Sequence, residues 1–371
     1  MSYRGSAQGV PVSAGAHDLN DFEQRFADAL AAEDAALEDR AHEARAYFDS
    51  LPNFQYEDVV GAGAFGVALR VRQIDSAGRS RKLIIKRARH HDRWDELRNE
   101  ISIMARLNGS AHIARVIAYK EDVEDEVLHR RLRFRLARRL INRIRRRPPH
   151  FLAGLAGPTL VLEYLENGSV DRLLEKIQMV NQTIPNRILW SIFLCSAPAL
   201  EEIKETGPPT ANFCHGDMHG GNILFGSTGD FPEHAVIPPA KLIDFGLARQ
   251  VGAISTPRNL MDVGKAIMWL ILGEMVPLEI FPVEHLGIAT RGGSLLGDGF
   301  SAQHPAIDLE LRDLLVRCLA DSAWDRPQLA EVLEAGKDAV RRKDAAFYGP
   351  LATQESDDAI RRFVQELIYN A

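Results

Sequence analysis

The chain has 371 residues, of which 46% are hydrophobic and 26% charged, and its formal net charge is −6. This composition is typical of a globular protein with roughly two to three folding units of about 150 residues each. No apolar run reaches the roughly 18 residues that a membrane-spanning helix needs, and residues 1–16 lack an apolar secretory core. Three isolated cysteines argue against a disulfide framework. We therefore expect a cytoplasmic or nuclear protein.

The first part of the chain predicts an extension ahead of the first domain. Residues 1–17 are rich in Gly, Ser and Ala, which predicts a disordered start. From Asp18 to Phe48 apolar residues recur near helical spacing, and Pro52 ends the pattern. We expect residues 1–50 to form this start and a helix packed on the outside of the next domain.

Strand patterns and one helix come next. The strand-like runs lie at 58–60, 67–71, 83–86, 113–119 and 159–164, with a helical stretch at 92–107. Beyond residue 167 the pattern is mainly helical, apart from short strands near 222–225 and 241–243. This order predicts an α+β protein with a small, mostly antiparallel lobe at 51–163, a larger helical lobe at 164–340 and a helical tail at 341–371.

A glycine-rich segment lies between the first two strand patterns. Residues 61–66 read Gly-Ala-Gly-Ala-Phe-Gly. A Rossmann site would need a helix to begin here, whereas this segment joins two strands. Glycines in such a hairpin would let the backbone approach a phosphate closely, with Phe65 closing the tip. A plain glycine turn explains the motif equally well.

A lysine ends the third strand pattern. Lys86 follows the apolar run Leu-Ile-Ile, and a buried lysine is costly unless it is paired. Glu100 on the predicted helix is the expected partner. Glu96 is the alternative, but it lies only ten positions away in the sequence and is better explained as a solvated surface charge.

Two short segments carry the polar groups that phosphoryl transfer needs. Residues 214–222 read Cys-His-Gly-Asp-Met-His-Gly-Gly-Asn, and residues 242–246 read Leu-Ile-Asp-Phe-Gly. The reaction requires a carboxylate that positions a hydroxyl nucleophile, and oxygen ligands that hold Mg²⁺ on the nucleotide phosphates. Asp217 suits the first task, and Asn222 and Asp244 suit the second.

Together these motifs resemble the protein kinase family over about residues 55–340. The resemblance implies a bilobal kinase-like fold and an ATP- and Mg²⁺-dependent transfer to a hydroxyl group, most simply of Ser or Thr in a protein substrate. It implies catalytic roles for Asp217, Lys86 and Glu100, and metal binding by Asn222 and Asp244. The nucleotide-binding residues that it implies lie in the glycine loop, above the adenine and in the interlobe hinge: Gly61, Gly63, Gly66, Ala68, Ile84, Lys86, Glu163 and Leu165.

Other positions fit the same resemblance. Above the adenine, the family usually has a valine followed by an alanine on the next strand. This chain has Ala68 and Ile84 at those positions, small and large exchanged, so the total side-chain volume is roughly kept. His215 and Phe245 are expected to pack between the lobes. Asp262 resembles the buried aspartate that supports the catalytic loop, and Arg326 with the following proline resembles a late feature of the family.

The chain also departs from the family pattern. Gly216 replaces the usual arginine, which argues against control by phosphorylation of the activation loop. His219 replaces the usual lysine, so the loop looks like that of aminoglycoside and other small-molecule kinases. Only 18 positions separate Asp244 from Asp262, and no Ala-Pro-Glu lies between them, so the segment that cradles a peptide is short. The hairpin at 226–239 is enlarged.

An insertion precedes the fifth strand pattern. It opens with acidic residues, and ten arginines then fall between 130 and 147 with leucines at four-residue intervals, before two prolines. This pattern predicts a basic amphipathic helix for an acidic partner, an anionic membrane surface or nuclear import. Alternatively, the helix rests on the small lobe and its arginines pair with the acidic stretch. Since Phe134 is its only aromatic residue, specific nucleic-acid binding is not expected.

Three functions remain open at this point. The first is a divergent Ser/Thr protein kinase, the second a small-molecule kinase of the same fold, and the third a pseudokinase scaffold. The intact polar positions favour the first, while Gly216, His219 and the short segment favour the second. The third competes because a fold by itself does not establish activity.

Overall fold

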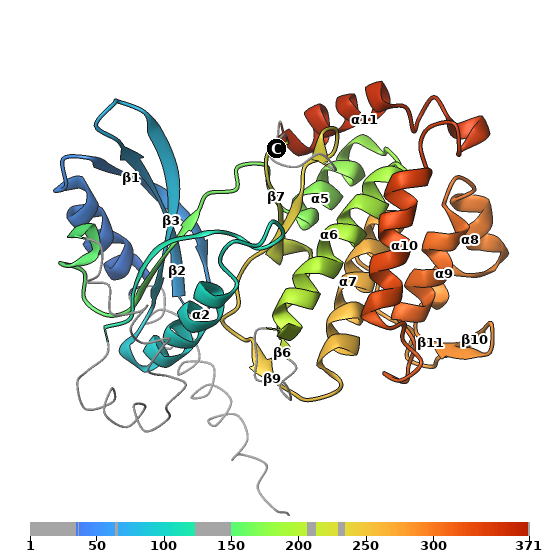
Figure 1. The fold of residues 1–371 in the computed structure, drawn as a ribbon, viewed down its shortest axis with the longest axis horizontal. Helices are drawn as coiled ribbons and strands as arrows, with labels where there is room; N and C mark the ends of the chain where they lie inside the picture. The colour runs from blue at the N-terminus through green and yellow to red at the C-terminus, as the bar shows by residue number, and fades with distance from the viewer. Residues whose placement is uncertain are drawn as a thin grey trace, which may run out of the picture.

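The computed structural model describes residues 35, 37–63, 66–122, 150–205, 213–228 and 234–369. They form a sheet lobe and a larger helical lobe that lie side by side (Figure 1). This arrangement confirms the predicted α+β, bilobal architecture. Within the described residues, no helix combines the length and apolar character that crossing a membrane requires.

The sheet lobe is built on five antiparallel strands in the order β1-β2-β3-β5-β4. The strands are β1 (Phe54–Ala62), β2 (Gly66–Ile74), β3 (Ser80–Ala88), β4 (Val116–Lys120) and β5 (Thr159–Glu163). Alternate residues of β2 and β3 are buried, as expected when one face of a strand packs on a core. On β5, Val161 joins one core cluster, while Leu160 and Leu162 join another.

Helices cover both faces of this sheet (Figure 1). Residues 37–49 are helical, and Ala44 and Phe48 in this segment are fully buried beside Val161 and the inward residues of β2. On the other face, α2 (Trp94–Arg106) buries Leu97 and Ile101 in the cluster that continues into the helical lobe. A short 3₁₀ turn, η1 (His91–Arg93), leads into α2. The position of α2 between the two lobes determines where Glu100 points.

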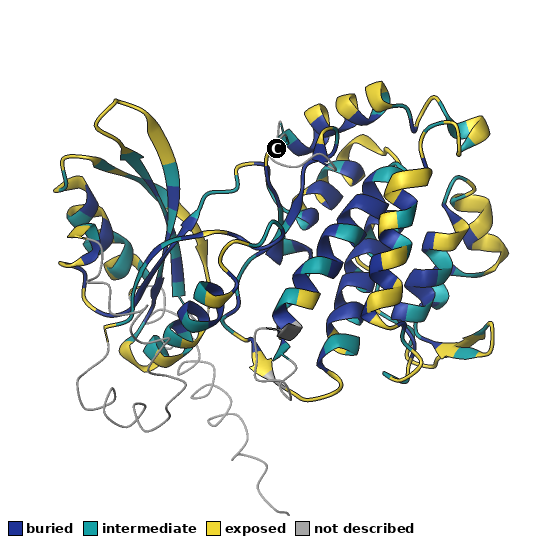
Figure 2. Ribbon diagram, viewed as in Figure 1, coloured by how far each residue is buried: buried dark blue, intermediate teal, exposed yellow. Residues whose placement is uncertain are grey.

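The helical lobe is organised around α6 and α7, whose inner faces are buried (Figure 2). Its helices are α5 (Val170–Val180), α6 (Asn186–Glu205), α7 (Ser255–Leu272), α8 (Gly297–Gln303), α9 (Leu309–Cys318), α10 (Leu329–Arg342) and α11 (Asp357–Phe363). Its short strands pair as β6 (Phe213–Cys214) with β9 (Arg249–Gln250), β7 (Ile223–Phe225) with β8 (Ala240–Leu242), and β10 (Val283–His285) with β11 (Ile288–Thr290). Short turns in this lobe are η3 (Gly220–Asn222), η5 (Gly293–Leu295), η6 (Gly349–Leu351) and the π-type η7 (Val364–Tyr369). The turn η2 (His150–Leu152) belongs to the sheet lobe, where Leu152 joins the core cluster of Phe48.

The fourth strand begins later than its sequence pattern predicts. The apolar run starts at Ile113, but β4 starts at Val116. The preceding residues pair with the helical lobe instead, because Ile113 bridges Leu242 and the Ala114 N–H donates to the Leu242 carbonyl at 3.0 Å. The two lobes are therefore connected by backbone hydrogen bonds at this point. The basic helix expected at 130–147 and the tip residue Phe65 lie outside the described residues.

Candidate active site between the lobes

A cavity of about 530 Å³ opens between the two lobes. A volume of this order, with apolar walls and a few convergent polar groups, suits a small-molecule ligand. The lining includes every residue expected to contact the nucleotide or a metal: Gly61, Gly63, Gly66, Ala68, Ile84, Lys86, Glu100, Glu163, Leu165, Asn222 and Asp244. Asp217 is not part of the lining, and 45% of its side chain is exposed.

Lys86 joins two acidic side chains from different parts of the fold. Its Nζ lies 2.8 Å from Oε1 of Glu100 and 2.6 Å from Oδ1 of Asp244. The Glu100 side chain is only 2% exposed, so the carboxylate needs this partner. The pairing that the sequence predicted for Lys86 is therefore present, and Glu96 instead contacts Arg93 near the start of α2.

The charges of this trio are set by burial and by one another. Burial alone would lower the pKa of Lys86, but Glu100 and Asp244 outweigh it and raise that pKa, so the ammonium stays charged. Burial raises the pKa of Glu100 in spite of Lys86, because Asp244 competes for the same cation. For Asp244, burial opposes the charged form, but Lys86 together with the Gly246 N–H outweighs it and lowers the pKa. Lys86 therefore forms ionic contacts with both carboxyl groups.

The backbone around Asp244 is held in an uncommon conformation. Its φ of +60° is in the left-handed region, which few residues other than glycine adopt. The Gly246 N–H donates to its Oδ1 at 3.2 Å, and Asn99 on α2 donates to the Ala248 carbonyl at 3.2 Å. Strained residues of this kind persist where surrounding contacts enforce them, often at functional sites. Here α2 and the segment after Asp244 are fixed together.

The loop that carries Asp217 and Asn222 is closed by their own contacts. The Asn222 amide donates to the Asp217 carbonyl at 2.8 Å and to its carboxylate at 3.3 Å. His215 lies fully buried beneath, with ring centroids 4.6 Å from Phe245. Its Nε2 donates to the Ile243 carbonyl at 3.0 Å, and burial lowers its pKa to about 4. A neutral His215 therefore connects the loop that carries Asp217 to the segment that bears Asp244.

Gly216 has a steric explanation that the sequence did not reveal. Its φ is +83°, and a Cβ at this position would lie 2.4 Å from the Leu247 carbonyl oxygen. An arginine therefore cannot occupy this loop without moving the backbone. Gly66 faces a similar obstacle, because a Cβ there would lie 2.3 Å from the Arg87 carbonyl oxygen where β2 meets β3.

The residue that supports the catalytic loop differs from the sequence prediction. Asn259 on α7 accepts from the His215 N–H at 3.0 Å and donates to the Phe213 carbonyl at 3.2 Å. Asp262, one turn further along, instead contacts Arg258 and Lys265 at 3.5 and 3.8 Å. Asp262 is buried, as the resemblance implied, but Asn259 provides the side-chain hydrogen bonds to the loop, and no local pattern distinguishes Asn259 from other polar residues of a helix.

His219 lies between two carboxylates, those of Asp171 and Asp217. Its Nδ1 is 3.5 Å from Asp171 and its Nε2 is 3.9 Å from Asp217. The Gly221 N–H also approaches Nδ1 at 3.1 Å, which favours the neutral ring. The hydrogen bond to Asp171 and the charge of Asp217 have the larger effect and raise the pKa of His219. Two anions that flank one imidazole favour its protonated form.

The segment between β9 and α7 is very short. Strand β9 ends at Gln250 and α7 begins at Ser255, so only residues 251–254 connect them. Arg326, the residue of the late Arg-Pro feature, donates to the backbone carbonyls of Pro257 and Ala320, both at 3.0 Å. The start of α7 is thus fixed directly to the segment between α9 and α10.

The hinge is fixed by Glu163. Its Oε1 accepts from Lys241 Nζ at 2.7 Å and from the Arg115 N–H at 2.8 Å. Its own N–H donates to the Arg115 carbonyl at 3.0 Å. Because the amide is engaged, the carbonyl is the backbone group of Glu163 that a ligand in the cavity can use.

Comparison with known protein families agrees with this geometry. Residues 54–263 match the family described as the protein kinase domain. The match covers more than half of the chain, from the start of β1 to the middle of α7. The chain therefore belongs to the protein kinase family, whose reaction class is phosphoryl transfer of the kinase type.

Proposed function

We propose that this protein transfers the γ-phosphate of ATP, with Mg²⁺, to the hydroxyl group of serine or threonine in a protein substrate. The observation that carries the proposal is the contact of Lys86 with both Glu100 and Asp244, at 2.8 and 2.6 Å. In kinases the lysine–glutamate pair and the metal-binding aspartate must both be in position for transfer. In the same proposal, residues 51–163 form the nucleotide lobe, 164–340 the acceptor lobe and 341–371 a helical tail.

The nucleotide part of the proposal rests on the walls of the cavity. Ala68 and Ile84, on neighbouring strands, would cover the adenine from above. The carbonyl of Glu163 and the amide of Leu165 would form hydrogen bonds with the polar edge of the adenine. Lys86 would move from its contact with Asp244 to the nucleotide phosphates, while Glu100 keeps it oriented.

The metal part rests on the types of atom that the site offers. Asp244 provides carboxylate oxygens, and Asn222 provides a side-chain carbonyl oxygen while its amide nitrogen donates to the Asp217 carbonyl. Oxygen ligands of this kind, completed by phosphates and water, are those that Mg²⁺ prefers. When bound there, Mg²⁺ would neutralise charge on the transferring phosphoryl group.

Asp217 would orient the attacking hydroxyl and accept its proton. Its exposed side chain, next to the cavity and not within it, suits contact with an acceptor that arrives from solvent. His219, between Asp217 and Asp171, would supply positive charge near the phosphate when protonated.

A small-molecule acceptor is the second candidate, and one observation favours it. Residues 251–254 are all that separate β9 from α7, so this segment gives a peptide little to bind. The family match to protein kinases keeps a protein acceptor first. A metabolite with a hydroxyl group would use Asp217 in the same way.

The test is a transfer assay with radiolabelled ATP and Mg²⁺. The natural chain is compared with Asp217→Asn and Lys86→Met, using protein extracts and metabolite pools as separate acceptors. Label in protein that both variants lose supports the proposal, whereas label only in metabolites establishes the second candidate. Nucleotide-induced thermal stabilisation without any label would identify a pseudokinase and refute both.

A further inference from the structure

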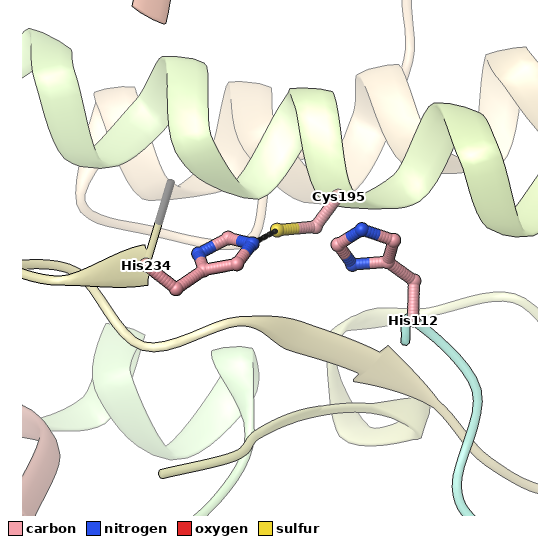
Figure 3. Close-up of side chains that lie close together, drawn as sticks. All are labelled: His112, Cys195 and His234. Atoms are coloured by element: carbon pink, nitrogen blue, oxygen red, sulfur yellow. Dashed lines mark hydrogen bonds between the residues drawn. The ribbon is translucent and has the colours of Figure 1, made fainter. Parts of the chain in front are cut away.

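Three side chains with metal-binding atoms meet away from the cavity between the lobes (Figure 3). His112 lies in the loop between α2 and β4, Cys195 lies on α6, and His234 lies in the enlarged hairpin between β7 and β8. One nitrogen or sulfur atom from each lies within 4.8 Å of the other two, and all three residues are buried. Among the His, Cys, Asp and Glu side chains of the described residues, these three form a group with their ligand atoms close together.

One distance in this group already fits metal coordination. Cys195 Sγ and His234 Nε2 are 3.6 Å apart. Zinc bonds of about 2.05 Å to nitrogen and about 2.3 Å to sulfur, at a tetrahedral angle, place the two ligand atoms about 3.6 Å apart. The three ligand atoms lie within 4.8 Å of one another. A pair at this upper limit would have to approach by about 1 Å for all three to bind one ion. A thiol–imidazole hydrogen bond also explains 3.6 Å, so the distance alone does not decide.

The second observation concerns the other nitrogen of each ring. His234 Nδ1 lies 3.1 Å from the Ile237 carbonyl, and His112 Nδ1 lies 3.4 Å from the Ala240 carbonyl. A carbonyl oxygen can only accept, so each Nδ1 carries the proton and each Nε2 carries a lone pair. Metal-binding histidines are typically oriented by such a contact with a carbonyl. The hairpin segment that provides His234 thus orients both rings.

The donor set indicates which ions the site would take. Two imidazole nitrogens and one sulfur, without a carboxylate, disfavour Mg²⁺ and Ca²⁺ and favour thiophilic ions. We infer that His112, Cys195 and His234 bind one thiophilic d¹⁰ cation, Zn²⁺ or Cu⁺. The Cys195 thiol loses its proton to solvent on binding, so binding strengthens as pH rises. A water completes four-coordinate Zn²⁺, whereas Cu⁺ is stable with the three protein ligands.

The position of this cation site gives it a structural role. The Leu242 N–H donates to the His112 carbonyl at 2.9 Å, and Leu242 ends β8 two residues before Asp244. A bound ion would link the loop before β4, helix α6 and the hairpin whose second strand leads to Asp244. The site would therefore stabilise the junction of the lobes, and its test does not depend on kinase activity.

The experiment uses the full chain without a histidine tag, stripped of metal with a chelator. Zn²⁺, Cu⁺ and the spectroscopic substitute Co²⁺ are added separately, and metal content, thiolate-to-cobalt absorption and thermal midpoint are measured. We expect one ion per chain, a cobalt–thiolate band and a raised midpoint. Competition between Zn²⁺ and Cu⁺ identifies the preferred ion. Added Mg²⁺ should not displace the bound Co²⁺.

Matched variants locate the site. Cys195→Ser and His234→Gln should lose the bound ion, the cobalt band and the rise in midpoint. Cys318→Ser is the control, because Cys318 is equally buried but lies outside the group, and burial raises its pKa to about 12. This control should bind as the natural chain does.

Two results would overturn the inference. One is an absence of tight binding, of the cobalt–thiolate band and of any metal-dependent midpoint in the natural chain, which would leave a buried thiol–imidazole hydrogen bond only. The other is unchanged binding in Cys195→Ser. If that variant does not fold, protection of Cys195 against alkylation by added Zn²⁺ in the natural chain replaces it, and equal alkylation with and without metal counts against the site.

Discussion

On the nucleotide side of the cleft, Lys86 contacts Glu100 and Asp244 within 2.8 Å, whereas on the acceptor side residues 251–254 alone connect β9 to α7. The first region is held by partners from β3, α2 and the end of the β7–β8 hairpin. The second is short and relies on Arg326 to fix the start of α7. For the proposed function, this difference implies that nucleotide binding would depend on contacts across the whole fold, while the choice of acceptor would depend on a short local segment.

The largest expected effect separates these two regions directly. Asp217→Asn should lower the turnover number by about 10²–10⁴-fold, because an amide cannot accept the hydroxyl proton. Nucleotide binding should be retained, since Asp217 does not line the cavity. Steady-state transfer rates and nucleotide-induced thermal shifts measure the two effects. Equal loss of both would show that the regions are not independent.

Gly216 offers a comparison within the acceptor side. Gly216→Ala should destabilise the protein more than Gly252→Ala, measured by denaturant unfolding. Both glycines have a φ near +84° (+83° and +85°), so each substitution costs about 1–3 kcal/mol of backbone strain. Only at Gly216 would the new Cβ meet a backbone oxygen, at 2.4 Å, while nothing lies within 4 Å at Gly252. Identical costs would contradict the steric explanation.

A smaller effect is expected at the support of the catalytic loop. Asn259→Ala leaves the His215 N–H and the Phe213 carbonyl without their side-chain partner, which should destabilise the protein by about 1–3 kcal/mol, without the backbone clash that Gly216→Ala adds. Asp262→Asn should change the transfer rate less, because its contacts are to Arg258 and Lys265 on its own helix. Unfolding free energies and turnover numbers are compared. A larger effect at Asp262 would restore the sequence prediction.

The smallest expected effect is a pH dependence from His219. The hydrogen bond to Asp171 and the charge of Asp217 raise the pKa of His219 in the folded protein. The contribution of the imidazolium is therefore complete below the unfolded value of about 6.5 and is lost as pH rises through the raised pKa. Asp171→Asn should move this decline to lower pH, and His219→Lys should remove it. A rate profile that is the same in all three proteins would exclude His219 from transfer.

Some residues could be found from the sequence because their chemistry is local. Lys86 lies near the end of a strand of alternating burial and Glu100 lies on the inward face of an amphipathic helix, so burial required them to pair. The segments around Asp217 and Asp244 combine residue types that few other reactions need together. Asn259 and the left-handed conformation of Gly216 could not be found, since both depend on α7 and on the Leu247 carbonyl, which are distant in sequence.

The order of strands and helices, the glycine loop and the polar residues of phosphoryl transfer were determined by the sequence itself, because periodicity and residue type express local preferences. Only the tertiary structure decided which side chains meet. It paired Lys86 with Asp244, 158 positions apart, and brought His112, Cys195 and His234 together from three elements. Such contacts arise when whole helices and strands pack on one another, and no short-range pattern in the chain specifies them.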